Sequence, residues 1–294
     1  MQITIEGLGK TYGKGRRALD GVDLRLDSGM TGLLGANGAG KTTLMRILAG
    51  VLRPTAGRVL VGGHDLATSA GRIAVKRMLG YLPQELAVYP DLTAAEFLDY
   101  IALLKGIDDR QARRRQVEHL LGQVGLADDA NRRAGTFSAG MRRRLGIAQT
   151  LLGDPRLIIV DEPTAGLDPQ ERMRFRALLA GLGGDRTVIL STHILDDVAQ
   201  SCPRVAVLTA GRLVFAGTTE GLVGAAAGRT FVVDSRVPLG RDDVLVNATA
   251  FADGTRVRIV STGPPPGARP VPPTLEDGYV ALLQDGGVTA EVAR

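Results

Sequence analysis

The chain has 294 residues, of which 44% are hydrophobic and 23% charged, values typical of a soluble globular protein. At this length a single core begins to divide, so we expect a main domain and a smaller one. The formal net charge of +5 includes no long basic block, so a nucleic-acid partner is compatible with the charge but not indicated by it. The single cysteine, Cys202, excludes an intrachain disulfide and a cysteine-based zinc site.

The sequence carries no pattern of a membrane span or an export signal. No window approaches the roughly 20 apolar residues that a spanning helix needs. Residues 1–7 lack the basic start and apolar run of a signal peptide. If the protein acts at a membrane, another chain must supply the spanning part.

Two strands with alternating apolar residues are predicted near the N-terminus, one around Ile3 and Ile5 and the other over residues 19–26. Tyr12 lies in a K-T-Y-G-K turn between them. Beside a nucleotide site, an exposed tyrosine can stack on a base. As an isolated residue it would instead pack against the fold, and the residues alone leave both interpretations open.

The stretch from Gly35 to Thr43 reads G-A-N-G-A-G-K-T-T. An apolar run over residues 30–34 precedes it as a buried strand, and a helix is predicted to begin near Lys41. A strand, a glycine-rich turn and a helix are the context that the pattern G-x-x-x-x-G-K-[ST] requires. We therefore predict a nucleoside triphosphate site here.

The residue types of this loop suit phosphate binding. Its glycines permit backbone conformations in which successive N–H groups point at phosphate oxygens, and the helix N-terminus adds positive potential. Lys41 can reach the β- and γ-phosphates, and the Thr42 hydroxyl can ligate Mg²⁺. The residues predicted to bind the nucleotide here are Gly35, Ala36, Asn37, Gly38, Ala39, Gly40, Lys41, Thr42 and Thr43.

Two polar residues further along each have a functional and a structural interpretation. Gln84 follows a strand predicted over residues 78–82, where it can face a bound metal or be an ordinary loop glutamine. Ser138 is predicted to be the N-cap of a helix. A helix N-terminus with a serine hydroxyl is a candidate phosphate site, although an ordinary capped helix has the same pattern.

Two helices are predicted between these two residues, over residues 91–104 and 110–124. Thr93 and Glu96 form a capping-box pattern at the start of the first helix. Because the helices separate two groups of strands, we expect a helical subdomain inserted into an α/β core.

Carboxylates and a histidine follow two further predicted strands. Residues 157–160 form a continuous apolar run, typical of a strand buried on both faces, and lead into Asp161 and Glu162. Asp161 can hold Mg²⁺ and Glu162 can orient or deprotonate an attacking water. The alternative is that the two acids merely form a solvent-exposed strand end. His193 follows a strand over residues 188–191 and either donates to a γ-phosphate or is structural.

The composition changes after about residue 217, and we read residues 223–294 as a small β-rich domain without recognisable chemistry. Its predicted elements are short strands at 231–233, 244–246 and 257–260, a hairpin turn at Asp253-Gly254, a proline-rich linker over 264–273 and a last helix over 274–283. A hairpin across Ala210-Gly211 precedes this domain.

Together these motifs resemble those of the nucleotide-binding subunits of ATP-binding cassette (ABC) transporters over about residues 1–219. The matching elements are the Walker A loop (Gly35 to Thr42), the Q-loop residue Gln84, the signature (Phe137 to Met141), the Walker B Asp161 with the catalytic Glu162, the D-loop (Ala165 to Asp168), the switch His193 and the base-stacking Tyr12. Ala139 stands where the family signature usually has glycine, and Met141 replaces the commoner glutamine.

The resemblance implies an α/β fold, with a P-loop NTPase core that contains a mixed sheet. We expect the ABC nucleotide-binding domain over residues 1–222, with its helical signature subdomain over about 85–155. The small C-terminal accessory domain, of α+β type, would cover residues 223–294.

The resemblance also implies ATP hydrolysis. Mg²⁺ would be held by Thr42, Gln84 and Asp161, with Lys41, Glu162 and His193 acting on the γ-phosphate and the water. A head-to-tail dimer, of two copies or of this chain and a second cassette, would enclose two ATP molecules. The residues that complete the nucleotide sites are Ser138, Ala139, Gly140 and Asp168.

Within the family, the F-S-x-G-M-R-R-R signature and the appended domain look like those of bacterial exporters of drugs, antibiotics or lipids. The expected partner is an integral-membrane permease, with this chain on the cytoplasmic face of the membrane and no nucleic acid bound. The alternatives are an ATP-gated clamp on nucleic acid and a ribosome-associated cassette ATPase. The short spacing between the two halves of the site counts against the nucleic-acid clamp, and the single cassette counts against the ribosome-associated ATPase.

Overall fold

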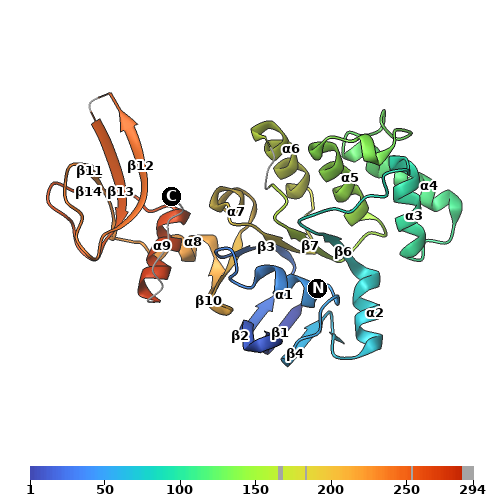
Figure 1. The fold of residues 1–294 in the computed structure, drawn as a ribbon, viewed down its shortest axis with the longest axis horizontal. Helices are drawn as coiled ribbons and strands as arrows, with labels where there is room; N and C mark the ends of the chain where they lie inside the picture. The colour runs from blue at the N-terminus through green and yellow to red at the C-terminus, as the bar shows by residue number, and fades with distance from the viewer. Residues whose placement is uncertain (165–167, 183, 253, 287–294) are drawn as a thin grey trace. The chain divides into compact units, whose positions relative to one another are not determined.

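The computed structural model describes residues 1–164, 168–182, 184–252 and 254–286 (Figure 1). The chain divides into two compact units. The larger unit consists of Met1–His193 with Leu208–Leu213, and the smaller unit of Ile194–Val207 with Val214–Arg294. The domain boundary after residue 222 stays a prediction.

The larger unit contains an antiparallel sheet whose strands, in order, are β2 (Arg16–Leu26), β1 (Ile3–Tyr12), β4 (Ala56–Val61) and β5 (His64–Asp65). Ile3 and Ile5 are buried, as their alternation with polar residues predicted. Tyr12 was predicted in a turn but is the last residue of β1, where it pairs with Arg16. A 3-10 helix, Gly13–Gly15, follows it.

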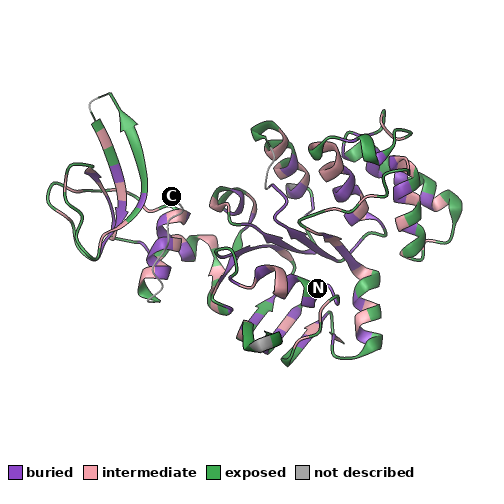
Figure 2. Cartoon of the chain, viewed as in Figure 1, coloured by how far each residue is buried: buried purple, intermediate pink, exposed green. Residues whose placement is uncertain are grey.

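The same unit contains four neighbouring parallel strands, which in order are β3 (Gly29–Leu34), β8 (Thr187–Ser191), β7 (Leu157–Asp161) and β6 (Leu79–Leu82). Every residue of β7 and β8 is buried, which explains their continuous apolar runs (Figure 2). Because the strands are parallel, their carboxyl ends meet at one edge of the sheet. The segments that begin at residues 35, 83, 162 and 192 start at that edge.

The helices of the larger unit are α1 (Lys41–Leu48), α2 (Ser69–Met78), α3 (Ala94–Leu104), α4 (Arg110–Gln123), α5 (Ala139–Leu151) and α6 (Pro169–Ala180), with a 3-10 helix at Ala134–Thr136. Helices α3, α4 and α5 pack on one another and fall in the range predicted for the helical subdomain (Figure 1). The predicted capping box is present, since the Thr93 hydroxyl accepts from the Glu96 N–H at 3.2 Å and the Glu96 carboxylate accepts from the Thr93 N–H at 2.8 Å.

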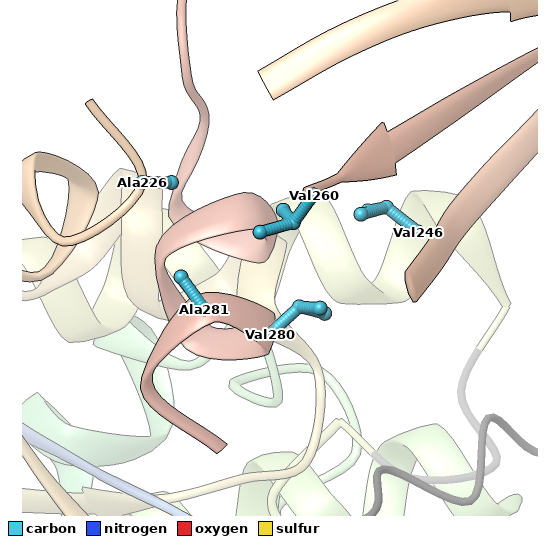
Figure 3. Packing of buried hydrophobic residues seen from close by; sticks show 5 residues of the cluster. All are labelled: Ala226, Val246, Val260, Val280 and Ala281. Carbon is cyan, nitrogen blue, oxygen red and sulfur yellow. The ribbon is translucent and has the colours of Figure 1, made fainter. Parts of the chain in front are cut away.

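The smaller unit contains an antiparallel sheet whose strands, in order, are β12 (Val244–Phe251), β13 (Gly254–Val260), β11 (Thr230–Asp234) and β14 (Arg269–Pro270). Its helices are α7 (Leu195–Ser201), α8 (Thr219–Gly224) and α9 (Leu275–Asp285). Figure 3 shows the core between α9 and the sheet. Its residues are Ala226, Val246, Val260, Val280 and Ala281.

One turn and one strand refine the predictions for the C-terminal part. Ala210 and Gly211 have φ angles of 48° and 81°, the two positive values of a type I′ hairpin turn, and they join β9 (Arg204–Thr209) to β10 (Arg212–Thr218). Pro270 was predicted in a linker but lies in β14, where it pairs with Phe231. Because β14 is an edge strand, the missing N–H of proline does not interrupt the hydrogen bonds of the sheet. The predicted turn residue Asp253 lies outside the described residues.

Candidate functional site

The phosphate loop between β3 and α1 requires glycine at two close approaches. Gly35 has a φ of 153°, and a Cβ there would lie 2.4 Å from the Leu208 carbonyl oxygen. Gly40 has a φ of 107°, and its Cβ would lie 2.6 Å from the Ala18 carbonyl oxygen. A side chain at either position would therefore displace backbone, and the loop would lose the shape in which its N–H groups can face an anion.

Three polar side chains from separate elements meet beside this loop. The buried Lys41 ammonium donates to the Gly35 carbonyl at 2.6 Å, and its Nζ lies 3.6 Å from Glu162 Oε1. Glu162 Oε2 lies 2.7 Å from Nδ1 of His193. The strand order explains this convergence, because β8 lies between β3 and β7 and brings His193 to the carboxylate that follows β7. The structure thus brings together the three residues predicted to act on the γ-phosphate.

Asp161, the last residue of β7, has a buried carboxylate oxygen that no hydrogen bond satisfies within the described part of the chain. Only 1% of its surface is exposed, and its Oδ1 has no hydrogen-bond partner among the described residues. Burial raises the pKa of this carboxyl group, and the neighbouring Thr42 hydroxyl lowers it in part. A divalent cation would satisfy Oδ1 and offset the cost of the buried charge, so Asp161 and Thr42 fit the predicted Mg²⁺ site.

A cavity of about 640 Å³ surrounds these groups, a volume typical of a small-molecule site. Tyr12 is half exposed in its wall, with its hydroxyl 3.4 Å from the Thr43 hydroxyl. The predicted residues that line the cavity are Tyr12, Ala36, Asn37, Gly38, Ala39, Gly40, Lys41, Thr42, Thr43, Gln84, Glu162 and His193.

Arg16, Ala18 and Arg46 also line this cavity, although the sequence analysis did not select them. Arg46 lies on α1, one helical turn beyond Thr42, so its spacing from the phosphate loop was a usable signal. Arg16 faces Tyr12 across the β1–β2 pair, and this register becomes visible only once the strands are paired.

The signature residues lie elsewhere in the larger unit. Ser138 is the N-cap of α5, as predicted, and its hydroxyl accepts from the Met141 N–H at 3.2 Å. Asp168 is the N-cap of α6 and accepts from the Glu171 N–H at 2.9 Å. Neither residue lines the cavity, and nor do Ala139 and Gly140. The D-loop residues 165–167 lie outside the described residues.

Arg143, on the second turn of α5, connects this helix to the cavity. Its guanidinium donates to the carbonyls of Gln84 and Pro163, each at 2.7 Å, and also to the carbonyl of Glu162. Glu162 has a φ of 47°, a left-handed conformation that is unusual for a residue with a side chain and needs support from its surroundings. Arg143 supplies that support and holds the Gln84 segment against it.

The fold and the cavity together define a P-loop ATPase of the cassette class. The helical insertion is present, and its helix α5 begins at the signature. The chain matches the family described as ABC transporter over residues 19–165. It is 38% identical over 98% of its length to the daunorubicin resistance ATP-binding protein DrrA3 of Streptomyces coeruleorubidus, of which the match covers 90%. The chain therefore belongs to the ABC transporter family, as an ATP-binding subunit that hydrolyses ATP.

Other relatives and solved structures agree with this assignment. The probable multidrug ABC transporter ATP-binding protein YbhF of Escherichia coli is 39% identical over 79% of this chain and 40% of its own length. The structure of the ATP-binding cassette MJ0796, in a dimeric post-hydrolysis state bound to ADP and Pi, superposes with a TM-score of 0.67 at 25% identity. That match covers 74% of this chain and 98% of the cassette, and it confirms the predicted P-loop fold.

Arg143→Ala is expected to lower the turnover number of the ATPase by about tenfold to a hundredfold, the range that a misplaced catalytic group costs. The KM for ATP should change little, because Arg143 does not line the cavity. Arg143→Lys should recover only part of the rate, because one ammonium cannot reach carbonyls on two segments as a guanidinium does. Steady-state phosphate release measures both constants.

Arg142→Ala is the matched control, since Arg142 lies on the same turn of α5 and its side chain makes no hydrogen bond among the described residues. A loss in this variant equal to that in Arg143→Ala would show a general effect of charge on α5. Unchanged turnover in Arg143→Ala would contradict the positioning of Glu162 by this guanidinium.

Proposed function

We propose that this chain powers an exporter, by hydrolysing ATP at two sites formed between facing cassettes. The observation that carries the proposal is that Lys41, Glu162 and His193 meet beside the phosphate loop, in the wall of one cavity. Cassettes of this family dimerise and work with membrane permease subunits. A dimer also accounts for Ser138, Ala139, Gly140 and Asp168, which lie outside this cavity and would act on the ATP of the facing cassette.

The reaction is in-line attack of water on the γ-phosphate. Glu162 accepts the proton of the water, and His193 holds the γ-phosphate through its ring N–H. Lys41 exchanges its bonds to loop carbonyls for bonds to the phosphates and stabilises the developing charge. Thr42, Gln84 and Asp161 would hold Mg²⁺, which supplies further charge neutralisation on the β- and γ-phosphates. Tyr12 would stack on the adenine base.

The proposed cargo is a drug, an antibiotic, a lipid or a similar small molecule, because relatives of this chain are named for daunorubicin resistance and multidrug transport. The proposed partner is an integral-membrane permease, with this chain on the cytoplasmic face. Among the described residues, no helix is long and apolar enough to cross a bilayer. The permease would bind near Gln84 and Glu85, where Tyr89 is exposed and contacts Tyr100 edge-to-face at 5.4 Å.

Co-expression with the product of the neighbouring reading frame, which the proposal expects to be a polytopic membrane protein, tests the proposal. The two proteins should purify together in detergent, and the complex should show Mg²⁺-dependent ATPase activity that responds to candidate cargo. Glu85→Arg with Tyr89→Ala should release the permease while the isolated subunit still binds ATP. Purification with ribosomes or DNA, and with no membrane protein, would refute the exporter assignment.

A further inference from the structure

The smaller unit has a second cavity, of about 540 Å³, on one face of its sheet. Residues of one face alternate along each strand, and the register places them side by side: Asp234 pairs with Arg256, and Val232 with Arg258. Thr249 extends the row on β12, where it also pairs with Arg256. All five residues line the cavity.

The opposite face of the same strands forms a hydrophobic cluster. Its buried members are Phe231, Val233, Val257 and Ile259. The two faces of the sheet therefore differ: one carries this cluster, and the other carries charged side chains around the hollow and, at the end of β13, Val260, which packs against α9. The hollow is a feature of the sheet itself.

The lining of the hollow is strongly basic. Among the described residues that line it are the guanidinium groups of Arg236, Arg256, Arg258 and Arg269, and a single carboxylate, that of Asp234. Hydrogen bonds from Arg236 hold the pKa of Asp234 below its usual range, so this carboxylate is ionised at neutral pH. When a second carboxylate, Asp277 of α9, and the neighbouring Glu276, which also acts on Arg258, are counted, one positive charge remains in excess.

That second carboxylate, Asp277 of α9, fixes one of the arginines. Asp277 is fully buried, and it accepts from Nε of Arg258 at 2.8 Å and from Nη2 at 2.6 Å. The Pro272 carbonyl accepts from Nη2 as well. Nη1 has no partner among the described residues, so Arg258 is held rigidly by one edge and keeps donors for another group. A guanidinium fixed in this way binds an anion without losing side-chain freedom.

An aromatic ring borders the charged groups. The Phe251 ring is 47% exposed, and the Arg256 guanidinium carbon lies 4.4 Å from its centroid. Arg269 lies on β14, and its side chain makes no hydrogen bond among the described residues. The cavity thus combines a rigidly held guanidinium, that of Arg258, with further cationic groups and a flat apolar surface, in a volume that suits a small molecule.

We propose that this cavity binds a small phosphate-bearing ligand. Arg256, Arg258 and Arg269 hold the phosphate, because guanidinium groups match phosphate oxygens in charge and in geometry. The remainder of the ligand lies against Phe251. The phosphate belongs either to a soluble metabolite or to the headgroup of a phospholipid. The site is separate from the ATP cavity, which the larger unit forms on its own.

Calorimetry on the full chain tests this site, with the ATP cavity first saturated by Mg-ADP so that the phosphate loop is blocked. Glycerol 3-phosphate is the soluble probe. Vesicles of phosphatidylcholine with and without phosphatidylglycerol, in a co-sedimentation assay, are the lipid probe. The test variant is Arg256→Gln with Arg269→Gln. The control is Arg241→Gln, an exposed arginine of the same unit that does not line the cavity.

Saturable binding of glycerol 3-phosphate, weakened about tenfold or more in the test variant and unchanged in the control, supports the site and a soluble ligand. Sedimentation only with phosphatidylglycerol vesicles, lost in the test variant alone, supports the site and a lipid ligand. Binding of neither probe, or equal binding by wild type and test variant, overturns the proposal. The ATPase rate of the test variant should match wild type, which shows that it is folded.

Discussion

Glu162→Gln is expected to bind ATP, hydrolyse almost none of it and accumulate as a closed dimer. The amide keeps the size of the side chain but cannot accept a proton from the attacking water, and loss of a general base lowers rates by about a hundredfold to ten-thousandfold. It also removes the charge that lies 3.6 Å from the Lys41 ammonium and 2.7 Å from the His193 ring. Phosphate release measures the rate, and light scattering with Mg-ATP measures the dimer.

Glu118→Gln is the matched control, because Glu118 is an exposed carboxylate on α4 far along the chain from the phosphate loop. It should hydrolyse ATP at the wild-type rate and show no trapped dimer. Wild-type turnover in Glu162→Gln would remove Glu162 from its role as the base. A slow variant that binds ATP but stays monomeric would keep the base and contradict the closed dimer.

Lys41→Ala is expected to lose most of its affinity for nucleotide. Lys41 is the buried cation of the cavity, and its ammonium already bonds the Gly35 carbonyl at the place where phosphate oxygens would enter. A hydrogen bond between charged groups contributes about 1.5–3 kcal/mol, so affinity for ATP should fall by about tenfold or more. Calorimetric titration with Mg-ATP measures this change.

Thermal unfolding supplies an independent readout, because a ligand that binds only the folded state raises the melting temperature, and does so more the further its concentration exceeds its Kd. Mg-ADP should stabilise wild type and Lys76→Ala, an exposed lysine on α2, but not Lys41→Ala. Unchanged binding by Lys41→Ala would contradict the phosphate cradle.

Most elements that carry the site were predictable because their signals are local. The glycine spacing and the change to helical periodicity predicted a helix from Lys41, and α1 begins there. The capping box at Thr93 and the N-cap at Ser138 are both present. Each signal involves residues within one helical turn, so it acts before any long-range contact forms.

Elements with weak or misread local signals were missed. Helix α6 was not predicted, although Asp168 as N-cap and Pro169 at the first helical position are readable signs of a helix start. Helix α2, capped by Thr68, was also missed. Tyr12 was placed in a turn because glycine follows it, but pairing with β2 extends β1 through it.

The sequence alone determined the class of this protein: the ABC family, the triphosphate loop and the residue types that ATP hydrolysis needs, since each motif is a short run of neighbouring residues. Only the tertiary structure decided how those motifs meet. The strand order brings His193 and Lys41 to Glu162, and Arg143 reaches the Gln84 segment across 59 residues of chain. The pairing of β11 with β13 on one side and with β14 on the other likewise brings Arg269 to the cavity that Arg256 and Arg258 line. Strand order and register arise from pairings between distant segments, whose free energy depends on the whole fold and on no local pattern.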